Sequence, residues 1–387
     1  MMIEDRHGHS EGIDQWLRLI RADGVGPVLF GRLLNYFGSV GQALTATMSE
    51  LAKVEGIGEK TAHRIFSSRN QFDPEKEIRL AEKHGVTILH LQDRRYPPLL
   101  KTIHDPPPAL YVKGTIEDRD NLAVAIVGSR RCSHYGLEQA SRFAHLLASA
   151  GFTIVSGMAR GIDSSAHRGA IAARGRTFAV QGCGLSRVFP PENEDLFRMI
   201  GESGACVSEL PIEYEPLSEN FPGRNRIIAG LSLGVIVIDA SGRSGALLTA
   251  QAAVEYNREV MAVPGRVDSP SSVGAHRLIK DGARLVETVE DVMDALGYVG
   301  QGLKEHACQS ARTADERTNA PLFTQPKIPL DGPEKRVFEA LGSEPLHVDQ
   351  VIDNTGLTAS QVGAAMVSLR LKGLIRDLPG NCYVKRG

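Results

Sequence analysis

The sequence predicts a mixed α/β fold in which helices cover both faces of a mostly parallel β-sheet. From about residue 86 onward, short runs rich in β-branched residues alternate with stretches long enough for a helix, which is typical of consecutive βαβ units. A chain of 387 residues also exceeds one typical core, so roughly two to three domains are expected. The predicted strands are residues 123–127, 152–156, 177–181, 205–210, 235–239 and 259–263.

Ahead of this region, residues 12–70 have the pattern of a small all-helical module of the SAM or helix-hairpin-helix kind. Two glycine-bearing turns divide it, DGVGP at residues 23–27 and VEGIGEKT at 54–61. The second resembles the hairpin of a helix-hairpin-helix element, in which glycines let backbone N–H groups approach a phosphate. Lys60 and Arg64 would add positive charge. The pattern leaves open whether the module contacts DNA or serves as a spacer or protein-contact domain.

A compact C-terminal domain is expected after a polar stretch without apolar periodicity. Helices are expected at residues 333–341 and 348–354, and Thr358 with Gln361 has the spacing of a capping box that opens a third helix. An apolar stripe on that third helix and a short β wing near Tyr383 complete a winged-helix pattern.

The exposed face of the third helix carries Gln361, Ala364 and Ser368, with charge only near its end. This favours a protein-contact role over the reading of a DNA duplex. The expected domains are a helical domain at 1–72, an α/β domain at 73–298, a linker at 299–328 and a winged-helix domain at 329–387.

The composition excludes several classes of protein. The five cysteines lie far apart and include no Cys-x-x-Cys pair, which disfavours a disulfide framework and a structural zinc site. No run approaches the ~18 apolar residues that a membrane-spanning helix needs. We therefore expect a cytoplasmic protein with no membrane segment. The formal net charge is −2, so nucleic-acid binding would have to come from a local basic patch.

Small and polar residues follow each predicted strand, at the edge where ligands of such sheets bind. The first strand ends in GSRR at residues 128–131. A dinucleotide-binding turn would have a glycine where this chain has Arg130, whose side chain fills the space that a pyrophosphate needs. This disfavours NAD and FAD, and we expect no cofactor. Arg130 would instead extend toward a phosphate of a larger ligand.

Two further strand ends repeat this design. Residues 156–163 (SGMARGID) place Asp163 where it would cap the next helix, and residues 243–249 (RSGALLT) follow another strand in the same way. Helix N-termini present free backbone N–H groups and the positive end of the helix dipole. Three helix N-termini at one rim are therefore expected to form a track for several phosphates.

The most distinctive segment is FPGRNR at residues 221–226, which is expected to form a turn before an apolar run. A ring such as that of Phe221 stacks on bases, and the guanidinium groups of Arg224 and Arg226 match phosphate oxygens. Asn225 can pair with a base edge or cap the following helix. The segment alone leaves open an alternative in which Asn225 is only a cap and the arginines form ion pairs.

No catalytic or metal-binding set is evident in the sequence. His134 and His167 lie near the predicted rim without an evident nucleophile partner. Asp163, Glu209 and Asp239 fit hydrogen bonding at the rim better than acid–base catalysis, because no metal-ligand spacing accompanies them.

Taken in order, the motifs closely resemble one family of bacterial proteins. They are IVGSR at residues 126–130, SGMARGID at 156–163, FPGRNRIIAGLS at 221–232, SGALLTA at 244–250 and VPG at 263–265. This series resembles DNA-processing protein A, also called DprA or Smf, over about residues 86–296. The N-terminal helical module and the winged-helix tail fit the same family less specifically.

The resemblance implies a homodimer built on an extended Rossmann-like, doubly wound sheet. It also implies a non-enzymatic protein that binds single-stranded DNA, protects incoming DNA during natural transformation and loads the recombinase RecA onto it. Carried over by position, Arg130 would hold a phosphate and Phe221 would stack on a base. The residues expected at the DNA site are Gly128, Ser129, Arg130, Ser156, Gly157, Gly161, Asp163, Phe221, Arg224, Asn225, Arg226, Ser244 and Gly245.

One position departs from what the resemblance suggests. The acidic Glu219 stands just before Phe221, and no Lys is near it on that side. If relatives rely on a cation there, the affinity for DNA is expected to be lower here.

Two other functions remain as alternatives. A Rossmann-like enzyme that hydrolyses nucleoside phosphates would need a Glu over a Gly-rich phosphate loop, whereas the PGR segment at residues 264–266 lacks the further glycines and threonine. The other alternative is a purely structural adaptor for a recombinase. A mobility shift with oligo-dT and an incubation with nucleoside monophosphates would separate the three functions.

Overall fold

The computed structural model describes residues 12–297, 332–342, 346–371, 374–378 and 382–385. The chain divides into two compact units, Met1–Arg317 and Thr318–Gly387, and each is described by itself. Among the described residues, none of the helices is long and apolar enough to span a membrane.

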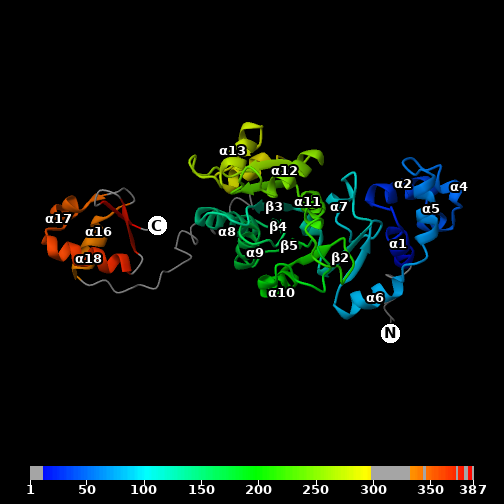
Figure 1. The fold of residues 1–387 in the computed structure, drawn as a ribbon, viewed down its shortest axis with the longest axis horizontal. Helices are drawn as coiled ribbons and strands as arrows, with labels where there is room; N and C mark the ends of the chain where they lie inside the picture. Colours follow the sequence, from blue (N-terminus) through cyan, green and yellow to red (C-terminus); the bar gives the residue numbers. More distant parts are fainter. Residues whose placement is uncertain (1–11, 298–331, 343–345, 372–373, 379–381, 386–387) are drawn as a thin grey trace. The chain divides into compact units, whose positions relative to one another are not determined.

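The first unit begins with a helical module, drawn in blue in Figure 1. Two of its turns contain a glycine in the left-handed region, Gly24 with φ 89° and Gly56 with φ 83°, where a residue with a Cβ would be strained. These turns join α1 to α2 and α4 to α5, as the sequence predicts. The helices are α1 Ile13–Ile20, α2 Pro27–Phe37, α3 Val40–Thr45, α4 Met48–Leu51, α5 Glu59–Ser68 and α6 Pro74–Lys83.

A nine-stranded sheet forms the centre of this unit, with the order β1-β2-β6-β5-β4-β3-β7-β8-β9. The strands from β6 to β9 are parallel, whereas β2 pairs antiparallel with both β6 and β1. The six predicted strands are all present as β3 to β8, and β1, β2 and β9 are additional to them. The strands are β1 Thr87–His90, β2 Ala109–Gly114, β3 Ala123–Gly128, β4 Thr153–Ser156, β5 Thr177–Val180, β6 Ala205–Ser208, β7 Gly234–Ile238, β8 Glu259–Ala262 and β9 Arg284–Leu285.

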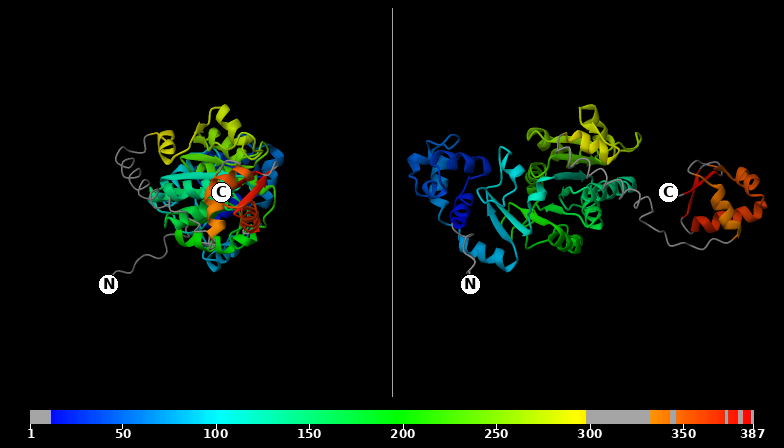
Figure 2. Two further views of the ribbon diagram at one scale, coloured as in Figure 1. Left: turned by 90° about the vertical axis from the view of Figure 1, so that its left-hand side faces the viewer. Right: turned by 180° about the vertical axis from the view of Figure 1, so that it is seen from behind.

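Helices cover both faces of the parallel strands (Figures 1 and 2). On one face α8 and α9 pack on strand residues such as Ile126 and Ile154, and on the other α11 and α12 pack on Ala125 and Val155. Burial of both faces explains why these strands are nearly continuous apolar runs. The remaining elements are α7 Pro98–Lys101, η1 Asp118–Asn121, α8 His134–Ser149, α9 Ile162–Ala172, η2 Pro191–Asn193, α10 Glu194–Ser203, α11 Asn220–Gly230, α12 Ala246–Glu255, α13 Val273–Lys280 and α14 Val289–Ala295.

One hydrophobic core continues from the helical module into the sheet. It includes Leu17 and Phe30 from the helices and Tyr111 from β2. The buried indole of Trp16 in α1 stacks on the imidazole of His90 in β1, with ring centroids 4.8 Å apart. The module is therefore packed on the sheet edge as part of the same unit.

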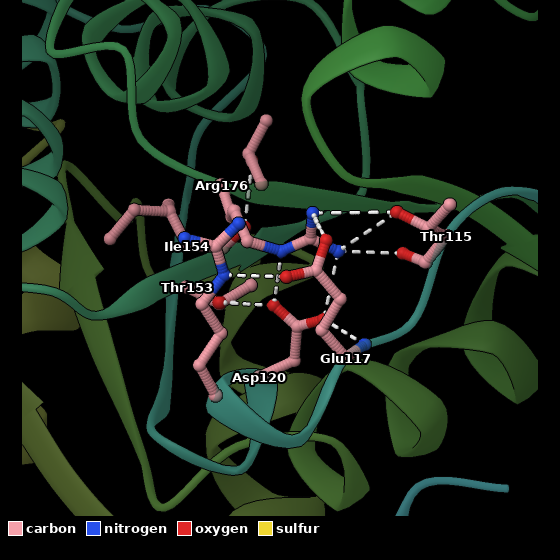
Figure 3. A network of polar contacts seen from close by, with 8 residues as sticks. Thr115, Glu117, Asp120, Thr153, Ile154 and Arg176 are labelled. Carbon is pink, nitrogen blue, oxygen red and sulfur yellow. Dashed lines mark hydrogen bonds and ion pairs between the residues drawn. The ribbon is translucent and has the colours of Figure 1, made fainter. Parts of the chain in front are cut away.

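A polar network holds together the amino-terminal ends of β4 and β5 (Figure 3). Arg176 donates from Nε and Nη2 to the two carboxylate oxygens of Asp120, at 2.6 and 2.9 Å. It also donates to Glu117 at 2.8 Å and to the carbonyl oxygen of Thr115 at 2.7 Å, and Thr153 donates to Asp120 at 2.6 Å. Bidentate hydrogen bonds between a guanidinium group and a carboxylate are strong and directional. The network therefore lies at the opposite end of these strands from their carboxyl ends.

The second unit, taken by itself, is a winged-helix fold. Thr358 and Gln361 form the predicted capping box, with Thr358 N donating to Gln361 Oε1 at 3.0 Å and Gln361 N donating back to Thr358 Oγ1 at 3.4 Å. The predicted apolar stripe, Val362, Met366 and Leu369, is buried in a core of the tail's own residues. Its elements are α16 Gly332–Ala340, β10 Leu346–His347, α17 Val348–Thr355, α18 Ala359–Leu371, β11 Ile375–Leu378 and β12 Cys382–Lys385, with the strand order β10-β12-β11.

The linker expected at residues 299–328 lies outside the described residues. The domain boundaries at residues 298 and 328 therefore stay predictions. The boundary at residue 72 also stays a prediction.

Candidate nucleic-acid interface

The carboxyl ends of the parallel strands open into one cleft with a volume of about 1040 Å³. Its walls come from the loops after β3, β4, β5, β6, β7 and β8, together with the first turns of α11 and α12. The sequence-predicted residues that line it are Gly128, Ser129, Arg130, Asp163, Phe221, Arg224, Asn225, Ser244 and Gly245. Ser156, Gly157, Gly161 and Arg226 do not line it.

Phe221 occupies a fixed position in this cleft. The guanidinium carbon of Arg130 lies 5.4 Å from its ring centroid and that of Arg224 lies 5.8 Å away. The ring of Phe189 is 5.3 Å away, with the two planes tilted by 42°. Gly182 allows the close approach, because a Cβ there would lie 3.0 Å from Phe221 Cδ1. These contacts hold the ring in a defined position at the cleft.

The segment 221–226 is helical, and the expected turn is wrong. It lies within the first turns of α11, Asn220–Gly230, where the fixed φ of Pro222 is compatible with a helix start. Asn225 is consequently not the helix cap. Its Nδ2 donates to the carbonyl oxygen of Gly245 at 3.3 Å, which ties α11 to the turn before α12.

Arg224 lines the floor of the cleft but is buried. Its Nη1 donates to the carbonyl oxygens of Gly157 and Val180, at 2.5 Å each, where β4 and β5 end. Gly157 is required there, because a Cβ would overlap the guanidinium group. Burial lowers the pKa of Arg224, although a guanidinium stays charged in proteins. The expected phosphate contact does not fit this burial, and Arg224 instead braces the strand ends below Phe221.

Asp163 is buried and does not cap α9, whose N-cap is Gly161. It accepts a hydrogen bond from the backbone N–H of Ala159 at 3.3 Å, and the N–H groups of Gly157 and Gly128 donate to it as well. Burial raises the pKa of Asp163. The first turn of α9 is not free for an anion either, because the N–H groups of Ile162 and Ser164 donate to the carbonyl oxygens of Ser129 and Ala159 at 3.4 and 3.1 Å.

At the other two helix N-termini of the rim, backbone N–H groups also donate to side-chain oxygens of the protein itself. Before α8, the N–H and Oγ of Ser133 donate to Asp239 Oδ2 at 2.7 and 2.6 Å, and Ser271 donates to its Oδ1 at 3.2 Å. Before α12, the N–H of Ala246 donates to Ser244 Oγ at 3.3 Å. The expected track of free N–H groups is thus mostly taken up, and anions in the cleft must be held mainly by side chains.

Arg130 and Arg131 are the exposed cations of the cleft. Within the described residues, neither forms an ion pair. Their loop lies close to α9 because Gly161, at φ 79°, has no Cβ that would strike the carbonyl oxygens of Ser129 and Arg130. Two cations without acidic partners make this loop the most favourable place for phosphates.

Arg226 points away from the cleft, toward the helical module. It donates from Nη1 to the carbonyl oxygen of Asp105 at 2.6 Å and from Nη2 to the carboxylate of Glu209. With Arg21 it lines a separate cavity of about 310 Å³. Burial raises the pKa of Glu209, and the charge of Arg226 opposes that rise. The expectation that Arg226 contacts DNA is therefore corrected, since its guanidinium group anchors α11 from the opposite side.

Ser156 and His167 are buried structural groups. Ser156 Oγ donates to a carbonyl oxygen of β3 at 2.6 Å. Thr177 Oγ1 donates to the carbonyl oxygen of Ile154 at 2.7 Å, so its contact with His167 Nδ1, also at 2.7 Å, places the imidazole proton on Nδ1. Burial lowers the pKa of His167 to about 3. Among the described residues there is no cluster of His, Cys, Asp and Glu that could hold a metal ion.

Sequence reasoning missed Phe189, which lines the cleft beside Phe221. Its only signal in the sequence is an aromatic residue in the FPPEN segment, residues 189–193, that follows a predicted strand. The prediction named the ends of the strands and passed over this longer loop.

Comparison with known proteins places the chain in a family. The sequence model of the family described as DNA recombination-mediator protein A matches residues 87–297. A model of the DprA-like N-terminal HHH domain matches residues 12–66, and one of the DprA winged helix domain matches residues 321–381.

Individual relatives agree with these matches. Protein Smf of Synechocystis sp. is 36% identical over 390 residues, which cover 96% of this chain and 98% of the relative. Protein Smf of Escherichia coli is 38% identical over 86% of this chain and 87% of its own length. The X-ray structure of DNA processing protein A from Streptococcus pneumoniae aligns with a TM-score of 0.66 at 33% identity, covering 74% of this chain and 98% of that one. The chain therefore belongs to the DprA/Smf family of DNA recombination-mediator proteins.

Proposed function

We propose that the chain binds single-stranded DNA in the cleft around Phe221, with little sequence preference and more tightly than duplex DNA. The observation that carries this proposal is the guanidinium group of Arg130, 5.4 Å from the Phe221 ring centroid in an open cleft. An aromatic ring accepts any base, and a guanidinium group holds phosphate oxygens. A base within a duplex is paired and stacked, and must be extruded before it can reach such a ring.

The residues of the cleft then divide by role. Arg130 and Arg131 hold phosphates, Phe221 stacks on a base, and Asn225 with the turn before α12 lines the path of the strand. The bracing set consists of Ser156, Gly157, Gly161, Asp163, Arg224 and Arg226, and the backbone of Gly128 and Ser129 positions Arg130.

Membership of the family supports a wider role, which is part of the same proposal. The chain is a recombination mediator that protects incoming single strands during natural transformation and loads RecA onto them, as a cytoplasmic homodimer without enzymatic activity. Supporting the last point, Asp163 and Asp239 at the cleft are engaged with backbone N–H groups and serine hydroxyls, so neither is positioned as a free general base.

Binding is tested by fluorescence anisotropy with labelled oligo-dT and a blunt duplex of equal length, at several salt concentrations. Oligo-dT is expected to bind more tightly, and log K is expected to fall with log salt by about −0.7 per phosphate neutralised. Equal affinities, or an affinity that does not respond to salt, would contradict the proposal.

The alternative enzyme is tested with the same preparation. Incubation with nucleoside mono- and triphosphates is expected to release neither phosphate nor base, and turnover of either would favour a hydrolase. Recombinase filament growth on single strands, with and without the protein, tests the loading role. Light scattering tests the dimer.

A further inference from the structure

We propose that Phe189 is a second base-contacting residue, which forms with Phe221 an aromatic wall for one unpaired base at one end of the cleft. The proposal rests on the proposed binding of single-stranded DNA and assigns a residue to that site which the shared motifs do not contain.

The geometry of the two rings sets what they can accept. Phe189 is partly exposed, and its centroid lies 5.3 Å from that of Phe221 at a tilt of 42°. Two rings this close leave no room for a base between them. Because they meet at an angle and both line the cleft, a base stacked on one ring meets the edge of the other.

Phe189 is held in place by the loop that carries it. Asn193 is buried, and its Nδ2 donates to the carbonyl oxygen of Met158 at 2.9 Å and to Ser164 Oγ at 2.8 Å. Earlier in the loop, Ser186 Oγ donates to the carbonyl oxygen of Ile212 at 2.6 Å. A ring on a fixed loop loses little freedom when a base binds, so its contact contributes fully to affinity.

The cleft also differs between its two ends. Phe189 follows β5, whereas Ser269 and Ser271 follow β8, and three strands separate β5 from β8 in the sheet. The exposed cations Arg130 and Arg131 follow β3 between these ends. A DNA strand bound in the cleft therefore has its stacked base at the β5 end and its phosphates over Arg130 and Arg131. The serine hydroxyls lie farther along, at the β8 end.

The test compares Phe189→Leu with the wild-type protein in anisotropy measurements with short oligo-dT. Leu keeps most of the apolar volume that packs against Phe221 and removes the π-face. We expect Phe189→Leu to weaken binding about fivefold or more, the lower limit of one base–aromatic stack. Tyr36→Ala is the matched control, because this aromatic residue is exposed on the helical module, and it should leave the affinity unchanged.

A position-dependent readout separates base contact from packing. A single abasic site is moved along the oligonucleotide, and the wild-type protein should lose affinity most at one position. In Phe189→Leu and in Phe221→Ala, the loss of affinity at the same position should become smaller. The double variant should then lose less affinity than the product of the two single losses, since both residues contact one base.

The outcomes distinguish the two proposals. If wild-type protein binds oligo-dT while Phe189→Leu keeps both its affinity and its abasic-site profile, Phe189 only packs against Phe221 and the inference is wrong. If the wild-type protein does not bind oligo-dT, the proposed function itself is wrong. Circular dichroism confirms that each variant is folded, and Phe189→Tyr, which keeps the ring, should bind like the wild type.

Discussion

Residues of one chemical type take opposite roles in this cleft according to how far they are buried. Arg130 is exposed and contacts the ring of Phe221, whereas Arg224 is buried and donates to backbone carbonyl oxygens below the same ring. Arg226 forms ion pairs on the other side of α11. Charge that can reach a ligand is therefore concentrated in the loop after β3.

Stacking and charge can be separated by two substitutions. Phe221→Ala should weaken oligo-dT binding by roughly 1 to 3 kcal/mol with an unchanged salt slope, because it removes a ring and no charge. Arg130→Ala should reduce the magnitude of the slope by about 0.7, the contribution of one phosphate contact. Arg168→Ala, an exposed arginine on α9 outside the cleft, is the control for lost charge. Equal slope changes in both variants would refute the assigned roles.

His167 should make the protein less stable in mild acid. Its folded pKa is lowered to about 3, so between this value and the ordinary pKa of ~6.5 the unfolded chain binds the extra proton. Stability from this group is present at pH 7 and is lost as pH falls, by about 2 kcal/mol between pH 7 and pH 5. The free energy of unfolding, measured in urea at both pH values, checks this loss. His167→Gln should show a smaller difference between the two pH values, and an unaltered difference would exclude this origin.

At the residue scale, local chemistry in the sequence placed Phe221 and Arg130 at the rim, and both line the cleft; that they contact DNA stays a prediction. It did not identify the burial of Arg224, because that depends on the carbonyl oxygens of Gly157 and Val180, which only the folded sheet brings beneath α11. The sequence did not identify Phe189 for the same reason, because its contact with Phe221 joins two segments far apart in the sequence.

Among the elements, α11 carries Phe221, the ring proposed to stack on a base, and is anchored on both sides. Phe221 and Asn225 face the cleft, while Arg226 reaches Asp105 and Glu209 beside the helical module. The position of the ring thus depends on an ion network that no ligand would touch.

Removal of this anchor should weaken DNA binding indirectly. Arg226→Met leaves Glu209 without its cation and should lower the free energy of unfolding by about 3 kcal/mol. Oligo-dT affinity should fall with an unchanged salt slope, because α11 loosens and no phosphate contact is lost. Adding Glu209→Gln should restore part of the stability. Unchanged affinity in a folded Arg226→Met protein would show that core packing alone positions α11.

The parallel strands were predictable as elements because burial on both faces makes them continuous apolar runs. The edge strand β1 was not, since it has a mixed burial pattern. The helical start of α11 was also missed, because Pro222 and Gly223 are frequent in turns, and tertiary packing decided the outcome.

For the molecule as a whole, the cleft is complete within the first unit. Deleting everything after residue 297 should therefore leave oligo-dT affinity within about threefold, or roughly 0.7 kcal/mol. Anisotropy of the truncated and full-length proteins measures this, with circular dichroism and light scattering as controls for folding and association. A loss of about tenfold or more in a folded protein of unchanged association state would mean that the principal DNA site lies in the winged-helix tail.

The indole of Trp16 gives this protein a built-in optical probe. It is the only tryptophan of the sequence, and it lies buried at the junction of the helical module and β1, while the cleft contains none. Its emission therefore reports on the junction alone, free of the direct quenching that a base stacked on an indole would cause. A spectral change on addition of oligo-dT would mean that occupancy of the cleft is transmitted to the helical module, through the ion network of Arg226 on the other side of α11. An unchanged spectrum would mean that the module and the cleft respond independently.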